Sequence, residues 1–216
     1  MEVYLENPEE HKLQTTTTLI LGEGNFSFAR EFAAAVTPPQ QQQGTTSDLK
    51  VYATSFDSRE TVHKNKFAQE NVASLAQMKH VEVTHSVDAT DLTSTFEHKI
   101  FNRIIFNFPH VGGKSNIRKC RQLLKDFFKS AYQHLSDDGC VLVALCQGQG
   151  GTPVDADRGG YGNTWQVVSQ AECSGFFAVC MELPNNLFFF PMQFQKVGTK
   201  IYEKKGCGSL QIEIYS

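Results

Sequence analysis

Short, mainly apolar runs alternate with amphipathic stretches along most of this chain. The apolar runs at residues 17–21, 49–55, 81–87, 100–107, 140–146 and 176–183 predict six strands. Between them, apolar residues recur every three or four positions over 26–36, 58–76, 117–135 and 163–173, which predicts four helices. The run IFNRIIFN at 100–107 is almost continuously apolar, as expected for a strand buried on both faces. This order of elements predicts a parallel, doubly wound sheet.

The rest of the chain completes this picture. The segment QIEIY at 211–215 alternates apolar and polar residues, which fits a seventh strand at an antiparallel edge of the sheet. The triplet DDG at 137–139 indicates a turn before the strand at 140–146. Residues 1–14 are polar and are expected to form a loose lead-in, followed by one domain over 15–216. We therefore expect an α/β, Rossmann-like fold of about seven mostly parallel strands with an antiparallel edge strand.

Composition narrows the functional classes. The net charge of −3 and the pI of about 6.2 argue against binding nucleic acid by bulk electrostatics, but they do not exclude a nucleic-acid enzyme with a local basic face. The first residues are acidic and polar, and no apolar run has membrane-spanning length, so we expect an intracellular protein without a membrane partner. The six cysteines form no CxxC pair, which argues against a metal site. Cys140, Cys146 and Cys180 fall in predicted strands and are expected to be buried, reduced thiols.

The segment LILGEGNFSFA at 19–29 is the most informative part of the sequence. A predicted strand ends in a glycine turn and a helix begins at once, which is how open α/β sheets build cofactor sites. Glycines let a ligand lie against the backbone, and the helix start offers unpaired N–H groups. The candidate cofactor-binding residues of this turn are Gly22, Glu23, Gly24, Asn25 and Ser27. The pattern lacks the third glycine of the dinucleotide fingerprint, which weighs against an oxidoreductase.

Acidic residues follow the next two predicted strands. Asp57 comes after the second strand, where its carboxylate could accept hydrogen bonds from ribose hydroxyls. The alternative is that Asp57 caps the next helix, beside Ser58. Asp88 comes after the third strand, where it could contact an adenine amino group or merely close a turn through its own side chain. A glycine turn with an acid after the next strand indicates an adenosine-containing cofactor.

The sequence Asn107-Phe108-Pro109-His110 follows the fourth predicted strand. An amide, a proline and an aromatic ring after a buried strand can form a rigid platform that hydrogen-bonds and stacks on a base taken out of its helix. The alternative is a turn that touches no substrate. The next helix begins with a local basic patch that includes Lys114, Arg118 and Arg121. This patch is either a phosphate-binding surface or an ordinary solvated helix face.

The motifs GEGNFSFA, YATSFDS, VDATDL, FNRIIFNFPHVGGK and VLVALCQGQGGTP together resemble one family over about residues 17–185. They are similar to the methyltransferase-like domain of fungal large-subunit ribosomal RNA uridine-N3 methyltransferases and of ferredoxin-fold anticodon-binding-domain proteins. The resemblance implies a class I methyltransferase fold and S-adenosyl-L-methionine as cofactor. It also implies that residues 22–25 cradle the methionine part, Asp57 binds ribose, Asp88 lies near adenine, and residues 107–110 face the target base.

The working hypothesis is an S-adenosylmethionine-dependent RNA methyltransferase that acts on uridine N3 in ribosomal RNA, in the nucleolus or the cytoplasm. His110 is the candidate base for the N3 proton, and its alternative is a ring that only stacks. Longer family members carry further domains, so a further domain or a partner subunit is expected to supply RNA affinity. The competing hypothesis is a catalytically inactive module of the same fold that binds RNA or a protein partner.

Overall fold

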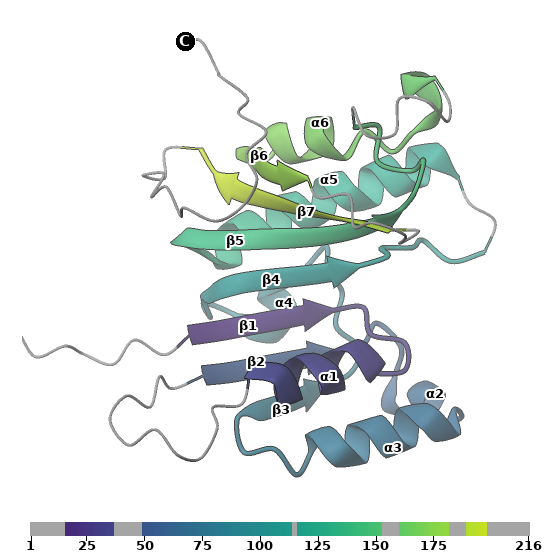
Figure 1. Cartoon of the computed structure of the whole chain (residues 1–216), viewed down its shortest axis with the longest axis vertical. Coiled ribbons are helices and arrows are strands. Elements are labelled where there is room, and N and C mark those ends of the chain that lie inside the picture. Colours follow the sequence, from purple (N-terminus) through teal and green to yellow (C-terminus); the bar gives the residue numbers. More distant parts are fainter. Residues whose placement is uncertain (1–15, 37–48, 114–115, 153–159, 182–188, 198–216) are drawn as a thin grey trace, which may run out of the picture.

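The computed structural model describes residues 16–36, 49–113, 116–152, 160–181 and 189–197 of the 216-residue chain. Its strands are β1 (Thr16–Leu21), β2 (Leu49–Thr54), β3 (Val81–Thr84), β4 (Phe101–Asn107), β5 (Leu135–Cys146), β6 (Phe176–Met181) and β7 (Phe189–Lys196). They form one seven-stranded sheet in the order β3-β2-β1-β4-β5-β7-β6 (Figure 1). Strands β1 to β5 are parallel, and β7 runs antiparallel to both β5 and β6.

Helices cover both faces of the sheet. They are α1 (Ser27–Val36), α2 (Arg59–Val62), α3 (Lys66–Leu75), α4 (Thr93–Phe96), α5 (Ile117–His134) and α6 (Val167–Glu172), with a short 3-10 helix at Tyr161–Asn163. α1 and α3 lie in front of the sheet in Figure 1, and α4, α5 and α6 lie behind it. Successive residues of β1 enter different cores, because Leu19 and Leu21 pack in one cluster and Ile20 in the other. This two-sided burial explains the near-continuous apolar runs of the central strands.

Aromatic rings hold the antiparallel end of the sheet on α5. The ring of Phe128 lies 5.1 Å from Phe127, 5.5 Å from Phe176 on β6 and 5.0 Å from Phe194 on β7, measured between ring centroids. All four rings are fully buried. Tilted and edge-on ring pairs of this kind add to the stability gained by burial. Phe128 therefore packs both β6 and β7 against α5.

The expected α/β fold is confirmed, with corrections to individual elements. The helix predicted over 58–76 is two helices, because the Asn65 side chain accepts hydrogen bonds from the N–H groups of Phe67 (2.9 Å) and Ala68 (3.3 Å) and starts a new helix. The antiparallel strand is β7, which lies one position in from the edge, and the edge strand is β6. The sequence did not predict β7, and the predicted strand at 211–215 lies outside the described residues.

The turn predicted at 137–139 is also wrong. β5 begins at Leu135, directly after α5, and its pairing with β4 shifts register between Phe101 and Arg103. The extra residues bulge, so the exposed Asp137 and Asp138 sit within a strand rather than before one. A bulge tolerates the turn-forming residues that suggested a separate turn.

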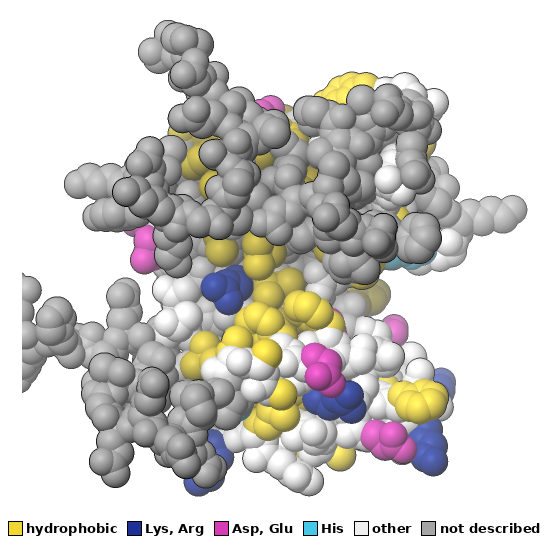
Figure 2. All heavy atoms as spheres, viewed as in Figure 1, with side chains coloured by type: hydrophobic (Ala, Val, Ile, Leu, Met, Phe, Trp, Pro, Cys, Tyr) yellow, Lys and Arg dark blue, Asp and Glu magenta, His cyan; other side chains and the backbone are white. Residues whose placement is uncertain are grey.

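Charged side chains are mixed in sign on the visible face of the molecule. Figure 2 shows hydrophobic side chains gathered over α1 and its neighbouring strands, with acidic and basic side chains interspersed lower down, around α3. Among the described residues on this face, no broad basic area stands out. This agrees with the small negative net charge of the chain.

Candidate active site

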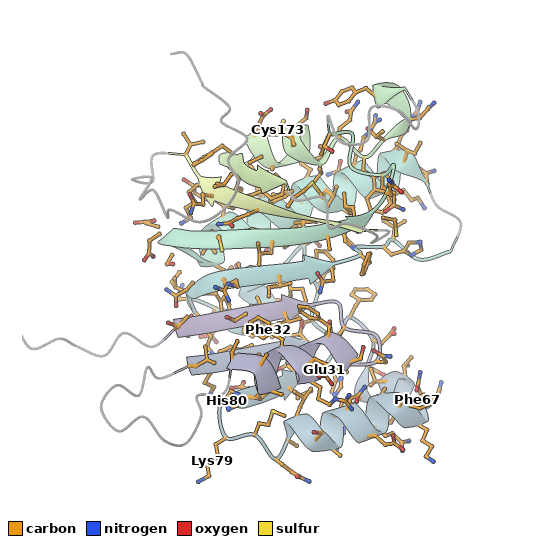
Figure 3. All side chains as sticks on the ribbon, in the orientation of Figure 1. Glu31, Phe32, Phe67, Lys79, His80 and Cys173 are labelled. Atoms are coloured by element: carbon orange, nitrogen blue, oxygen red, sulfur yellow. The ribbon has the colours of Figure 1, made fainter. Side chains whose placement is uncertain are left out.

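The carboxyl ends of the parallel strands lie together at one edge of the sheet, as Figure 1 shows. The strand order reverses between β1 and β4, which is where open α/β sheets bind ligands. Leu21 of β1 is in register with Phe106 of β4, so Gly22 and Asn107 leave the sheet side by side. Figure 3 shows Phe67 on the same side of the molecule, whereas His80, which precedes β3, lies on the opposite side. The fold thus brings the glycine turn and the predicted base platform together.

The two glycines of the turn have different environments. Gly22 has a φ of +71°, and a Cβ placed on it would lie 2.7 Å from Cε2 of Phe106. A Cβ placed on Gly24 would meet no described atom within 4 Å. The backbone therefore requires glycine at position 22, whereas the space beside Gly24 is open to a ligand.

Glu23 is a buried carboxyl between these glycines, with an exposed fraction of 8%. Its N–H donates to the carbonyl oxygen of Thr54 on β2 (2.8 Å), and its Oε2 accepts from the N–H of Ala29 near the start of α1 (3.2 Å). Burial raises the pKa of Glu23, and the hydrogen bond from Ala29 opposes that rise. Glu23 thus links the turn, the neighbouring strand and the first turn of α1.

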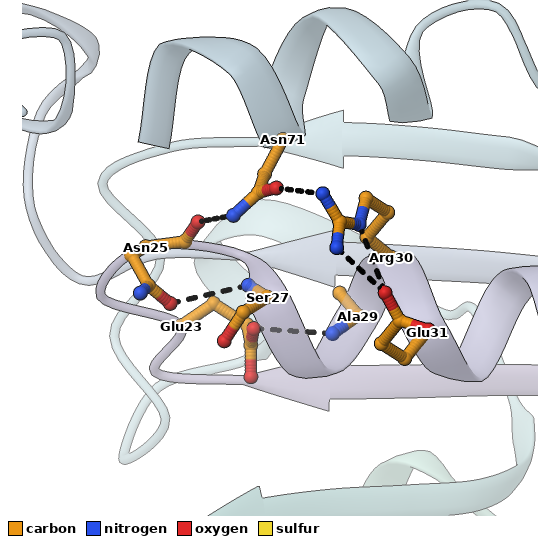
Figure 4. Close-up of polar contacts among 7 residues, drawn as sticks. All are labelled: Glu23, Asn25, Ser27, Ala29, Arg30, Glu31 and Asn71. Atoms are coloured by element: carbon orange, nitrogen blue, oxygen red, sulfur yellow. Dashed lines mark hydrogen bonds and ion pairs between the residues drawn. The ribbon is translucent and has the colours of Figure 1, made fainter. Parts of the chain in front are cut away.

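A polar network braces the glycine turn from α3 (Figure 4). Asn25 Oδ1 accepts from the N–H of Ser27 (3.1 Å), the first residue of α1, and Asn71 Nδ2 donates to the carbonyl oxygen of Asn25 (2.8 Å). Arg30 Nη1 donates to Asn71 Oδ1 (2.7 Å). Sequence reasoning missed Asn71 and Arg30, because no local pattern links a turn to a residue 46 positions away. The turn is held in shape without help from a ligand.

Asp57 has a fixed backbone and a free carboxylate. Its carbonyl oxygen accepts from Ser55 Oγ (2.8 Å) and from the N–H of Ser86 (3.2 Å). Its carboxylate is exposed and makes no hydrogen bond to any described residue. The α2 cap is Ser58, whose Oγ accepts from the N–H of Thr61, so the capping alternative for Asp57 does not hold. The carboxylate is therefore available as an acceptor for hydroxyl groups.

Asp88 closes a local turn. Its Oδ1 accepts hydrogen bonds from the N–H (2.8 Å) and from Oγ1 (2.7 Å) of Thr90. The structure therefore shows the turn-closing alternative. Asp88 is nevertheless exposed at the end of the segment that follows β3. A contact between its second carboxylate oxygen and adenine stays a prediction.

The platform residues leave β4 with mixed exposure. Asn107 is half-buried, and its amide makes no hydrogen bond to any described residue. Phe108 has a φ of 50°, its N–H donates to the carbonyl oxygen of Ala144 on β5 (2.9 Å), and its ring is 48% exposed. Pro109 is buried. A half-buried amide beside an exposed ring is an arrangement that can take a planar base.

His110 is exposed, and its ring has a defined hydrogen bond. The N–H of Gly112 donates to Nδ1 of His110 at 2.8 Å. In the neutral ring the proton is therefore on Nε2, which can donate a hydrogen bond but cannot accept a proton. This geometry favours His110 as a donor or a stacking ring over the predicted role as base.

The three basic candidates have different surroundings. Lys114 lies outside the described residues, and Arg118 is exposed near the start of α5. Arg121 donates from Nε (2.9 Å) and Nη2 (2.6 Å) to the carbonyl oxygen of Thr164 and from Nη2 to that of Gly162 (2.7 Å). Most of the hydrogen-bonding capacity of Arg121 is thus used to hold the segment before α6.

The loop after β5 completes this edge of the sheet. Gln149 Oε1 accepts from the N–H of Cys146 (3.1 Å), and the carbonyl oxygen of Gln149 accepts from the N–H of Trp165. Cys146 is exposed, so the prediction that it is buried is wrong: it is the last residue of its strand, where the sheet meets solvent. Cys140 is half-buried, and the side chain of Cys180 lies outside what the structure describes.

A polar hollow of about 340 Å³ lies between residues 90–93 and α5. It is lined by Thr90, Asp91, Thr93, Asp126, Lys129, Ser130 and Gln133. It contains none of the residues of the glycine turn or the platform.

Within the described ranges, no helix is long and apolar enough to cross a membrane, and no group of three or more potential metal ligands is present.

Comparisons with known proteins identify the family of this chain. The model of the family described as BMT5-like, rRNA (uridine-N3-)-methyltransferase BTM5-like, matches residues 19–191. The mouse ferredoxin-fold anticodon-binding domain-containing protein 1 homolog is 40% identical over 160 residues, which is 73% of this chain and 24% of the relative. The chain therefore spans about a quarter of that relative's length.

Two other proteins share less sequence with the chain. The 25S rRNA (uridine(2634)-N(3))-methyltransferase of Saccharomyces cerevisiae is 29% identical over 145 residues, covering 54% of this chain and 40% of the yeast protein. Among solved structures, a SAM-dependent methyltransferase from Aquifex aeolicus aligns with a TM-score of 0.56 and 17% identity, over 86% of this chain and 85% of that one. At this identity the structural match shows a shared fold.

Proposed function

This chain belongs to the BMT5-like family of rRNA (uridine-N3-)-methyltransferases, and we propose that it transfers a methyl group from S-adenosyl-L-methionine to N3 of a uridine in ribosomal RNA. Membership of this family and the methyltransferase fold make S-adenosyl-L-methionine its cofactor, as the sequence motifs predicted. One observation carries the proposal for the site. The open space beside Gly24, the carboxylate of Asp57 and the amide of Asn107 belong to the same edge of the sheet, and neither side chain hydrogen-bonds to a described residue.

The first half of this edge suits the cofactor. The space beside Gly24 accommodates the methionine part against the backbone of residues 22–25, and the carboxylate of Asp57 accepts hydrogen bonds from the two ribose hydroxyls. Asp88 lies further along, near adenine, with one carboxylate oxygen left for the amino group. When bound, the sulfonium supplies an already activated methyl group, so the main task of the chain is to align donor and acceptor.

The second half suits a uracil ring. The amide of Asn107 can both donate and accept hydrogen bonds, which matches the alternating carbonyl and N–H groups of uracil. The exposed ring of Phe108 provides a stacking surface, and Nε2–H of His110 can donate to a uracil oxygen. These donors stabilise the negative charge that spreads over the uracil oxygens when the N3 proton leaves for solvent. The deprotonated N3 would then be able to take the methyl group as the bond between the methyl carbon and sulfur breaks, which would leave S-adenosylhomocysteine.

Binding of the RNA chain requires more than this platform. Arg118 is exposed near the start of α5 and is our candidate for a phosphate contact, together with Lys114. Arg121 serves mainly to hold the segment before α6. The chain has a net charge of −3. We therefore propose that a further domain or a partner subunit contributes affinity for the RNA.

Calorimetric titration with S-adenosylhomocysteine tests the cofactor half of the proposal. We expect the wild-type chain to bind, and Asp57→Ala to bind at least about tenfold more weakly, because the ribose loses a charged acceptor. Asp138→Ala removes an exposed carboxylate from the start of β5, at the opposite edge, and should leave the affinity unchanged. Absence of binding by the wild-type chain would overturn the proposed methyltransferase activity and favour an inactive binding module. Equal affinity of Asp57→Ala would remove Asp57 from the site.

A further inference from the structure

We propose that His85 is a positioning residue for the cofactor site, acting through Ser55 on the backbone of Asp57. This inference rests on the proposed role of Asp57 as the ribose ligand. His85 was not among the residues that the sequence singled out. It follows β3, and it is connected to both loops that form the cofactor half of the site.

The hydrogen-bond chain has a fixed direction. Ser55 Oγ lies 2.8 Å from the carbonyl oxygen of Asp57 and 2.7 Å from Nδ1 of His85. A carbonyl oxygen only accepts, so the single hydroxyl hydrogen of Ser55 goes to Asp57. The Ser55 oxygen must then accept from His85, which places the proton of the imidazole on Nδ1. His85 therefore donates to Ser55, and Ser55 donates to Asp57.

The surroundings of His85 favour the neutral form of its ring. Burial lowers the pKa of His85, and the electrostatic interactions with His63 and Arg59 lower it further, while Glu60 opposes them. His63 packs edge-on against His85, with 6.3 Å between ring centroids. The His85 ring also packs edge-on against the ring of Phe26 in the glycine turn, with 5.6 Å between ring centroids. A fully buried Phe26 thus ties His85 to the turn that cradles the methionine part.

The backbone conformation around Asp57 depends on the hydrogen bonds that connect His85, Ser55 and Asp57. The N–H of Ser55 donates to the carbonyl oxygen of Thr84 (3.1 Å), and the carbonyl oxygen of Ser55 accepts from the N–H of Val87 (2.9 Å). Ser86 has a φ of 58°, which turns its N–H toward the carbonyl oxygen of Asp57. These hydrogen bonds fix the loop. Without Ser55 Oγ, however, the Asp57 carbonyl oxygen would accept only the hydrogen bond from Ser86. The His85–Ser55 pair therefore sets how the free carboxylate is presented.

Substitutions that mimic one ring nitrogen at a time test the direction of this chain. The NH₂ group of asparagine takes the place of Nδ1–H, whereas that of glutamine takes the place of Nε2–H. In titrations with S-adenosylhomocysteine, we expect His85→Asn to stay within about twofold of wild type, and His85→Gln and Ser55→Ala to bind about five- to tenfold more weakly. The double variant His85→Gln/Ser55→Ala should bind no more weakly than Ser55→Ala alone, since both act through one path. His98→Asn, at an exposed histidine before β4, is the matched control and should have no effect.

The outcomes separate this inference from the proposed function. If Asp57→Ala weakens binding but His85→Gln and Ser55→Ala do not, the positioning role is wrong and the cofactor site stands. If His85→Asn weakens binding as much as His85→Gln, the donor at the Nδ1 position is not what matters. Nitrogen-15 NMR of the wild-type imidazole gives a check that needs no variant to fold: the Nδ1–H tautomer of His85 supports the inference, and an Nε2–H tautomer overturns it.

Discussion

The two halves of the proposed site differ in how their polar groups are used. In the half formed by β1, β2 and β3, Asn25, Asn71 and Ser55 make hydrogen bonds within the chain, whereas the Asp57 carboxylate has no partner among the described residues. In the half formed by β4 and β5, the Asn107 amide has no partner among the described residues, and the Phe108 ring is exposed. The first half is preorganised for a ligand of constant shape. The second presents open groups to a base that must be moved into place.

This difference has a physical reason. A half-buried amide without a hydrogen bond costs stability, and such groups are rare unless a ligand completes them. The glycine turn must instead keep the space beside Gly24 open. Hydrogen bonds from other residues of the chain hold it in that conformation. Preorganisation lowers the ordering cost of binding the cofactor. The comparison predicts that changes in the second half affect catalysis, and that changes in the first half affect cofactor affinity or stability.

Asn107→Ala should have the largest effect. We expect methylation of a ribosomal RNA substrate to fall by about 100-fold or more, since a donor to the developing charge is lost. The affinity for S-adenosylhomocysteine should stay within about twofold, because the cofactor half is braced separately. Incorporation of labelled methyl groups and calorimetric titration measure the two quantities. If both are lost together, the platform is structural and the two halves are not independent.

The next test compares the two glycines of the turn. Gly24→Ala adds a methyl group into open space, so the thermal midpoint should stay near wild type while cofactor affinity falls by about tenfold or more. Gly22→Ala must adopt a φ of +71° and push against Phe106, so it should lower stability by about 1–3 kcal/mol. Thermal unfolding and titration separate the two effects. A Gly24→Ala protein with unchanged affinity would show that no ligand lies against this turn.

Glu23→Gln should have the smallest effect, and it depends on pH. Burial raises the pKa of Glu23 above its ordinary value of 4.5, so the folded chain favours the protonated form. That preference is fully present below the unfolded pKa and is lost as the pH rises through the folded pKa, where the buried carboxylate becomes charged. Glutamine keeps an oxygen for the N–H of Ala29 and carries no charge.

We therefore expect Glu23→Gln to stabilise the chain at pH 7.5 by on the order of 1 kcal/mol, which raises the thermal midpoint by about 2–4 °C. The gain should shrink as the pH falls toward 4.5, where Glu23 takes up its own proton. Thermal unfolding of both proteins across this range is the measurement. A variant less stable than wild type at pH 7.5 would mean that the hydrogen bond from Ala29 outweighs burial.

Much of the site could be predicted because it follows strand ends. The turn at 22–25, Asp57 and residues 107–110 each come directly after an apolar run, and parallel strands bring such positions to one edge. The family and the cofactor followed from the same motifs. The individual roles of these residues remain predictions, apart from the capping alternative for Asp57, which the Ser58 cap replaces.

Other features had no local signal. Arg121 reads as a basic residue of a helix face, yet its guanidinium binds carbonyl groups of Gly162 and Thr164, 41 and 43 positions away. β7 was missed, and the predicted break at 137–139 is a bulge within β5. Pairing partners and bulges depend on what lies beside a strand, which a window of sequence does not contain.

The sequence by itself determined the class of the fold, the family and the positions that we propose for ligand binding, because hydrophobic period and turn chemistry act over a few residues. The tertiary structure alone decided which side chains are free. It paired Asn71 with the glycine turn and His85 with Ser55, and in the part of the chain that the structure describes it gave the side chains of Asp57 and Asn107 no such partner. A side chain becomes available to a ligand only when no other part of the chain satisfies it, and that depends on residues distant in sequence but adjacent in space.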